Sequence, residues 1–150
     1  MANWYGSARS NFVRVADLAA LKNALAPFDI QVQAHPERPE YVYFSGSLDS
    51  GGWPASGLDA GGNEIDFAPV NHICPHLKKG EVLIMVEVGA EKLGYLTGYA
   101  VALTTDGRTV ALDIRDIYDL ALRRFGVSAD RVAEPLYASL PSCVASEAEH

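Results

Sequence analysis

The sequence predicts an α+β fold: a single domain built on a mixed or mainly antiparallel sheet of five to six strands, with about three helices. Segments with strand character come in runs with few helices between them, which is typical of this class. Asp106-Gly107 stands between two apolar segments and favours a tight antiparallel hairpin. The chain has 150 residues, of which 49% are apolar and 21% charged, so it can bury one substantial core.

The first half of the chain predicts three strands and one helix. Alternating, β-branched and aromatic residues indicate the strands, at residues 11–15, 30–34 and 41–45. Asp17 is a typical N-cap residue, and the helix after it carries leucines at helical spacing, at Leu18, Leu21 and Leu25. Pro27 ends this helix, because proline has no backbone N–H with which to continue it.

Residues 46–63 are the least regular part of the chain. They contain six glycines and the pair Trp53-Pro54, and irregular segments of this length in compact domains are usually functional or disordered. Trp53 is a candidate anchor for a protein partner, because aromatic side chains contribute disproportionately to binding at the centre of an interface. The sequence is equally compatible with a Trp53 that folds back to cover the core.

A short helix and a strong strand follow this segment. The helix is predicted to begin at Pro69, to kink or break at Pro75 and to end at Gly80. Residues 81–88 are apolar at both alternating sets of positions, which predicts a central strand of the sheet.

The last third of the chain predicts a hairpin, a helix and an extension. Residues 95–103 and 108–112 form the hairpin, and Asp113 is the expected cap of a helix that ends at Gly126. The expected buried side of this helix consists of Ile114, Ile117, Tyr118, Ala121 and Phe125. Residues 1–126 are therefore predicted to form the domain. Residues 127–150, rich in Ala and Ser, are predicted to be a partly disordered C-terminal extension.

Two histidines in the short helix are the best candidates for a metal site. His72 and His76 are four residues apart and would share one helix face, as two zinc ligands do, with Glu64 or Asp66 as an oxygen ligand. Ile73 stands where a zinc protease carries its glutamate base, and Pro75 disturbs the helix. The simpler interpretation is that both histidines are exposed or capping residues beside an apolar stripe.

Glu87 is the remaining candidate for acid–base chemistry. A carboxylate in a central strand would be desolvated, which raises its pKa and suits a general acid. The structural interpretation is stronger: Glu87 faces an open side of the sheet or pairs with Arg14 or Arg108. Since the sequence also has no G-x-S-x-G elbow and no P-loop, we predict no catalytic residue and no cofactor.

Negative charge is concentrated in the middle of the chain. Residues 39–77 contain no lysine or arginine, and residues 40–91 hold eight acids against two bases, a balance of −6 in a protein whose net charge is −7. Such a potential repels nucleic acid and attracts the basic surfaces that bind it. The candidate partner-binding residues are Asp49, Trp53, Asp59, Glu64 and Asp66.

Composition also bears on location and assembly. The longest apolar run is residues 82–86, far below the roughly 20 residues that a membrane helix needs. The N-terminus lacks the basic start and apolar run of a secretion signal. We therefore expect a cytoplasmic protein with no membrane contact, in which Cys74 and Cys143 are reduced. It is expected to be a monomer or a homodimer that does not bind nucleic acid directly.

Four short stretches of the sequence carry a resemblance to a known group of proteins. They are Trp4-Tyr5-Gly6-Ser7-Ala8-Arg9-Ser10-Asn11, Ser50-Gly51-Gly52-Trp53-Pro54, Gly89-Ala90-Glu91-Lys92-Leu93 and Gly98-Tyr99-Ala100-Val101-Ala102. Over roughly residues 2–126 the chain resembles small, largely uncharacterised proteins of plasmids and phages, often encoded near genes that blunt host defence. The resemblance implies a counter-defence role, such as anti-CRISPR or anti-restriction, and assigns no residue a function.

Three classes of function follow from these observations. The first is an anti-CRISPR-like inhibitor that presses an acidic face against a basic, nucleic-acid-handling defence complex of the host. The second is a small, metal-assisted enzyme that acts on a defence component. The third is a non-catalytic accessory or oligomerisation module, in which the exposed part of the sheet pairs between copies. We expect a binding protein rather than an enzyme.

Overall fold

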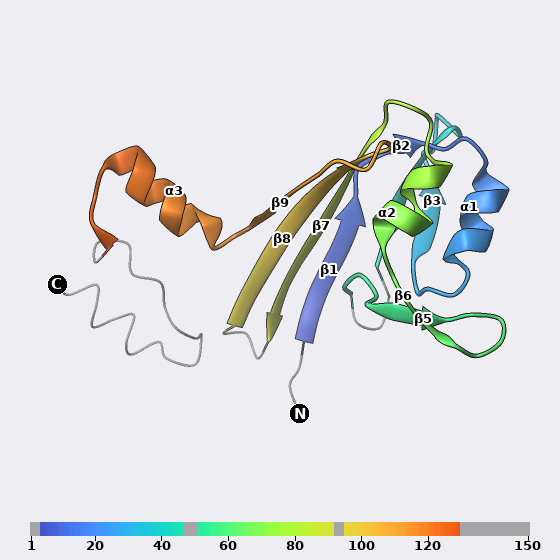
Figure 1. Cartoon of the computed structure of the whole chain (residues 1–150), viewed down its shortest axis with the longest axis horizontal. Coiled ribbons are helices and arrows are strands. Elements are labelled where there is room, and N and C mark those ends of the chain that lie inside the picture. The colour runs from blue at the N-terminus through green and yellow to red at the C-terminus, as the bar shows by residue number, and fades with distance from the viewer. Residues whose placement is uncertain (1–3, 47–50, 92–94, 130–150) are drawn as a thin grey trace.

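The computed structural model describes residues 4–46, 51–91 and 95–129 and confirms the α+β class (Figure 1). None of the helices in these ranges has the length and apolar composition needed to cross a bilayer. The described elements are β1 (Trp4–Ser10), β2 (Val13–Arg14), α1 (Leu18–Leu25), β3 (Gln31–Ala34), β4 (Tyr41–Ser45), β5 (Ser56–Leu58), β6 (Glu64–Asp66), α2 (Pro69–His72), the 3-10 helix η1 (Cys74–His76), β7 (Val82–Glu91), β8 (Tyr95–Thr104), β9 (Thr109–Asp113) and α3 (Asp116–Phe125).

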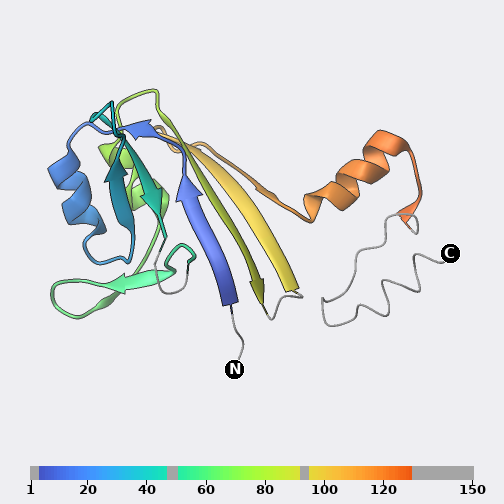
Figure 2. The ribbon, with the colours of Figure 1, turned by 180° about the vertical axis from the view of Figure 1, so that it is seen from behind.

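Seven of the strands form one antiparallel sheet, slightly larger than the predicted five to six. Its order is β2-β4-β1-β7-β8-β9, with β3 also paired to β4. The additional strand is β1, which lies between β4 and β7 (Figure 2). Gly6, Ser7 and Ala8 have little strand propensity of their own. Their extended state therefore follows from pairing, as in the registers Ser7↔Val88 and Arg9↔Ser45.

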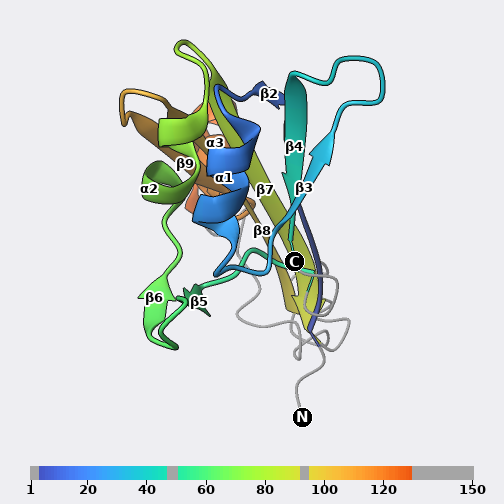
Figure 3. The same ribbon diagram turned by 90° about the vertical axis from the view of Figure 1, so that its right-hand side faces the viewer.

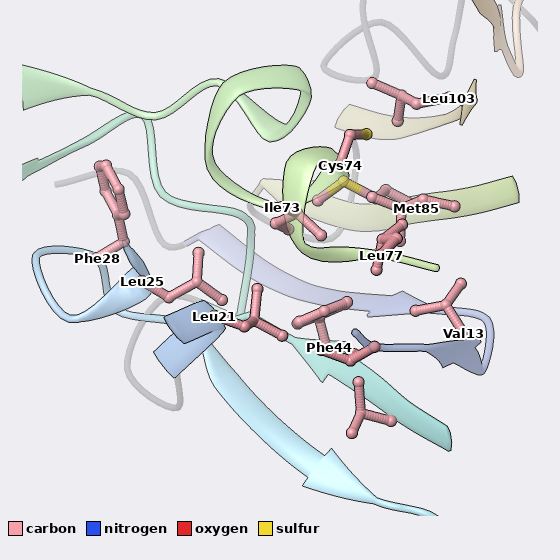
Figure 4. Packing of buried hydrophobic residues seen from close by; sticks show 13 residues of the cluster. Val13, Leu21, Leu25, Phe28, Phe44, Ile73, Cys74, Leu77, Met85 and Leu103 are labelled. Carbon is pink, nitrogen blue, oxygen red and sulfur yellow. The ribbon is translucent and has the colours of Figure 1, made fainter. Parts of the chain in front are cut away.

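One face of the sheet carries the core. Helices α1 and α2 lie together on this side of the sheet (Figure 3), and Leu83 and Met85 of β7 point into the same cluster. Figure 4 shows the packing of the buried residues, which include Val13, Leu21, Leu25, Phe28, Val42, Phe44, Ile73, Cys74, Leu77 and Leu103. Burial of such side chains stabilises the fold by roughly 25 cal/mol per Å² of apolar surface.

The helix boundaries confirm two predictions and correct a third. The Asp17 carboxylate accepts a hydrogen bond from the Ala20 N–H at 3.1 Å, so Asp17 is the N-cap of α1. Helix α2 begins at Pro69, as predicted, and the helical path breaks at Ile73, before Pro75. The extension of this helix to Gly80 was wrong. Leu77 is extended and bridges to Val15, because its side chain completes the core from a strand-like position.

On the opposite side of the large sheet, the area formed by β7, β8 and β9 with Tyr5 of β1 is apolar and uncovered by any described element, and it is here called the outer face. Strand β7 is central, as predicted, but only one of its faces is buried: Val86 is 38% exposed and Val88 is 50% exposed. By register, the outer face consists of Tyr5, Val82, Ile84, Val86, Val88, Leu96, Val110 and Leu112. Strand β7 is therefore apolar on both faces but covered on only one of them.

Helix α3 departs from the predictions at both its start and its packing. The predicted cap, Asp113, accepts instead from the Arg115 N–H at 2.8 Å, and the helix begins at Asp116. No residue of α3 is buried, so the prediction of a buried side was wrong for the described chain. The helix extends beyond the end of the sheet opposite to α1 (Figures 1 and 2). It ends at Gly126 in the left-handed region, as predicted.

The core location of α1 leads to a matched mutational test. Leu21 is fully buried, whereas Leu18, one turn earlier in the same helix, is 37% exposed. We expect Leu21→Ala to lower the free energy of unfolding by about 2–5 kcal/mol, since it leaves a cavity, and Leu18→Ala to lower it by clearly less. Urea unfolding of both variants measures the difference. Equal losses would contradict the described placement of α1.

Candidate partner-binding surface

Strands β5 and β6 form a separate two-stranded hairpin, which the sequence analysis treated as loop. Leu58 pairs with Glu64 and Ser56 pairs with Asp66. The Asp59 carboxylate organises the turn: Oδ1 accepts from the Gly61 N–H at 2.9 Å and from the Asn63 N–H at 2.8 Å. These hydrogen bonds lower the pKa of Asp59, with the Asn63 N–H as the largest cause.

The hairpin is docked to the core at its base. The Leu58 N–H donates to the Pro27 carbonyl oxygen at 3.3 Å. Ile65 and Phe67 pack against the core cluster, and the ring centroids of Phe67 and Phe28 lie 5.1 Å apart. The hairpin therefore lies at a defined place beside the end of α1 (Figure 1).

Two acidic side chains point outward from this docked hairpin. Glu64 and Asp66 are exposed, whereas Ile65 between them packs against the core, so both carboxylates lie on the outer side of β6. The Ser56 hydroxyl donates to Glu64 at 2.9 Å. Within the described chain, the ion pairs are Arg14–Glu81, Arg108–Asp106 and Arg115–Asp113. The acids of the hairpin are therefore not neutralised by the described cations.

The other acids of residues 40–91 lie elsewhere and do different things. Glu40 is exposed, just before β4, and Glu81 pairs with Arg14 at 2.7 Å. Glu87 holds the backbone of Trp53. Asp49 lies outside the described residues. The acids of this segment therefore lie in different parts of the fold. Among the described residues, the predicted binding acids that share one hairpin are Asp59, Glu64 and Asp66.

Trp53 lies against the core. Its side chain is partly buried and packs on the core cluster, and the indole Nε1 is buried without a hydrogen-bond partner in the described chain. The Trp53 N–H donates to Glu87 Oε1 at 2.6 Å. A Cβ on the preceding residue, Gly52, would collide with the same oxygen, so a larger residue there would require the Glu87 carboxylate to shift. This placement corresponds to the second interpretation of Trp53, as a cover of the core.

Glu87 contacts neither Arg14 nor Arg108. It lies on the core side of β7, where it accepts the Trp53 N–H and a hydrogen bond from the Tyr99 hydroxyl. Burial, followed by the charge of Glu87 and this hydrogen bond, raises the pKa of Tyr99 to about 12. Glu87 therefore ties the loop before the β5–β6 hairpin to the sheet.

The two candidate metal ligands do not share a helix. His72 is the last residue of α2, and His76 ends η1 beyond the break at Ile73. His72 Nδ1 lies 3.0 Å from the Ala68 nitrogen and 2.9 Å from its oxygen, and the ring packs 4.7 Å from that of Phe28. No cluster of three or more His, Cys, Asp or Glu residues suited to a metal occurs in the described ranges. The structure thus gives His72 a capping and packing position.

Comparison with known proteins leaves the site without a precedent. No family model matches the chain, and no curated protein and no solved structure matches it. The resemblance to mobile-element proteins therefore rests on its four short stretches alone.

The sequence analysis missed the β5–β6 hairpin for an identifiable reason. Six glycines between residues 46 and 63 suggested an irregular segment, and each strand has only three residues. The signals that were present are Asp59 before Gly61-Gly62, which is typical of a turn, and the alternation of Glu64, Ile65 and Asp66.

The contact between Tyr99 and Glu87 leads to a pH prediction. Because the pKa of Tyr99 is raised in the folded state, its contribution to stability is present below pH 10 and is lost between about pH 10 and pH 12. Glu87→Gln should lower the pKa of Tyr99 without restoring it to 10, since burial remains. Absorbance titration of tyrosinate, with Tyr99→Phe to identify the late-titrating group, measures this. A Tyr99 pKa unchanged by Glu87→Gln would exclude the contact.

The turn of the hairpin gives a second pH test, at the acid end. The lowered pKa of Asp59 contributes stability that is present above the pKa of an unfolded Asp, about 3.9, and is lost as the pH falls through the folded-state value. Asp59→Ala should therefore be less stable than wild type at neutral pH, and this difference should shrink below about pH 4. Asp66→Ala, which removes an exposed acid of the same hairpin, is the control. Thermal unfolding across pH measures both variants.

Proposed function

We propose that this protein is a binding protein of mobile elements that blocks a basic, nucleic-acid-handling defence complex of the host. The contact is made through the acidic β5–β6 hairpin, and a CRISPR effector is the first candidate for the target. The observation that carries the proposal is the pair Glu64 and Asp66, exposed on one side of a docked hairpin and not neutralised by the described cations.

The spacing of the pair supports a phosphate-like contact. Side chains two residues apart on a strand recur at roughly 6.7 Å, which is about twice the 3.4 Å rise per phosphate along one strand of duplex DNA. The two negative charges repel each other, and a lysine or arginine between them relieves that repulsion. A basic groove that normally holds nucleic acid offers such side chains.

The docking of the hairpin favours tight binding, in addition to the effect of its charge. A surface held in place by the Phe67–Phe28 contact and the Leu58–Pro27 hydrogen bond loses little conformational freedom on binding. The counter-defence context comes from the resemblance of residues 2–126 to mobile-element proteins. Action on such a complex places the protein in the cytoplasm.

Charge reversal tests the proposal directly. Glu64→Lys/Asp66→Lys leaves Asp59 in place and so keeps the turn intact. The matched control is Glu37→Lys/Glu40→Lys, which makes the same change in net charge at two exposed acids between β3 and β4. Captures from host lysate at low and high salt should recover a nucleic-acid-binding complex with wild type and the control, and lose it with Glu64→Lys/Asp66→Lys.

Further measurements on the captured complex separate binding from catalysis. Wild-type capture should weaken steeply with salt, because charged contacts are screened over about 8 Å at physiological ionic strength. Added duplex nucleic acid should compete with the protein, and inhibition should require about one protein per target. The proposal fails if Glu64→Lys/Asp66→Lys captures the complex normally. Inactivation of many targets by one protein would instead support the enzyme hypothesis.

A further inference from the structure

The outer face is unusual because a broad apolar area across three strands of the sheet is open to solvent. Val110 is 68% exposed, Leu96 is 66% exposed and Leu112 is 59% exposed. Val110 pairs with Ala102 of β8 and Leu112 pairs with Ala100, whereas Leu96 is itself on β8 and pairs with Ala90 of β7. No charged side chain interrupts this face across β7, β8 and β9. Continuous apolar patches of this kind mark sites where another surface packs.

Helix α3 carries the complementary feature, an apolar side without a partner in the described chain. Ile117 is 58% exposed and Phe125 is 75% exposed, and Tyr118 and Ala121 lie on the same side at helical spacing. The charged residues Asp119 and Arg123 occupy the other side. A helix of ten residues is marginal in water without tertiary packing. A stable α3 therefore requires a surface to cover.

The connection between β9 and α3 directs the helix away from its own sheet. The Ile114 N–H donates to the Gly98 oxygen at 2.8 Å, which keeps Ile114 in the strand ladder. The Asp113 N–H then donates to Asp116 Oδ2 at 2.7 Å and closes the turn. The Ile114 side chain fills the space over Gly98, where a Cβ would lie 2.8 Å from its Cγ2. These contacts lie at the turn from which α3 leaves the sheet and extends beyond its edge (Figure 1).

We propose that two copies of this chain exchange α3, so that the apolar side of each helix covers the outer face of the other copy. One two-fold arrangement then buries both uncovered surfaces of both chains, as an isologous interface does. The helix leaves the sheet at β9, an edge strand, so it can reach a second copy without crossing its own sheet. This proposal is independent of the acidic hairpin, which lies at the other end of the sheet.

Two other candidates for covering the outer face are residues 130–150 and an unrelated protein, and the oligomeric state of the purified chain distinguishes both from helix exchange. Residues 130–150 follow the end of α3 that lies farther from the sheet, and if they covered the outer face the full chain would be a monomer. An unrelated partner protein would also leave the purified chain monomeric. Exchange of α3 predicts a dimer of the purified full-length chain.

Light scattering on three matched variants tests the interface. Leu112 on the outer face, Ile117 on α3 and Leu58 on the β5–β6 hairpin are 59%, 58% and 61% exposed. Wild type and Leu58→Lys should have twice the mass of one chain, whereas Leu112→Lys and Ile117→Lys should each be monomeric and folded by circular dichroism. A monomeric wild type overturns the proposal, as does a dimer that survives both substitutions.

Cross-linking of mixed variants tests the exchange itself. In a Cys143→Ser background, with Cys74 buried, Val86→Cys marks the outer face and Leu120→Cys marks α3. Mixing the two full-length variants with a short bismaleimide should give a covalent dimer whose linked peptides contain positions 86 and 120. Absence of this link in the mixture overturns helix exchange, as does a link within one chain of the Val86→Cys/Leu120→Cys double variant.

Discussion

Coverage of one face of the sheet is the constraint on which the rest of the structure depends. In β7, Leu83 and Met85 enter the core below α1, α2 and η1, whereas the alternating residues Val86 and Val88 face outward. Because the described helices near the sheet all lie on one side, β7 and β8 each have one covered and one uncovered apolar face. The β5–β6 hairpin and the loop that Glu87 holds pack against the covered side, whereas no residue of α3 is buried.

The covered side explains how an irregular, glycine-rich segment acquires a defined shape. Glu87 projects from β7 toward the core and binds the Trp53 N–H, and the indole packs on the core cluster. Phe67 and Phe28 then hold the far end of the segment. The same contacts that complete the core therefore place Glu64 and Asp66 at the surface, which links the packing of this domain to its electrostatics.

The electrostatic pattern shows why charge along a sequence differs from charge on a surface. Eight acids between residues 40 and 91 suggest one acidic face. In the fold, Glu81 is neutralised by Arg14, and Glu87 is directed inward to a backbone N–H. The negative surface that remains on the β5–β6 hairpin is smaller and more localised than the composition suggests, and it is better suited to a specific contact than to a diffuse field.

The sequence by itself determined the elements with strong local signals. The Asp17 cap, the Asp106-Gly107 hairpin, the central position of residues 81–88 and the stop at Gly126 follow from turn chemistry and periodicity, which act over a few residues. The class of the fold followed from their order. Asp59, Glu64 and Asp66 were identified as candidates by charge alone.

Only the tertiary structure decided what depends on neighbours distant in the chain. Strand β1 is extended because β4 and β7 pair with it, and the β5–β6 hairpin persists because Phe67 docks on Phe28. His72 and His76 separate because the helical path breaks at Ile73, which is fully buried in the core between α2 and η1. Whether an apolar face is covered is likewise a property of the assembled elements, since periodicity shows that a face exists and not what packs against it.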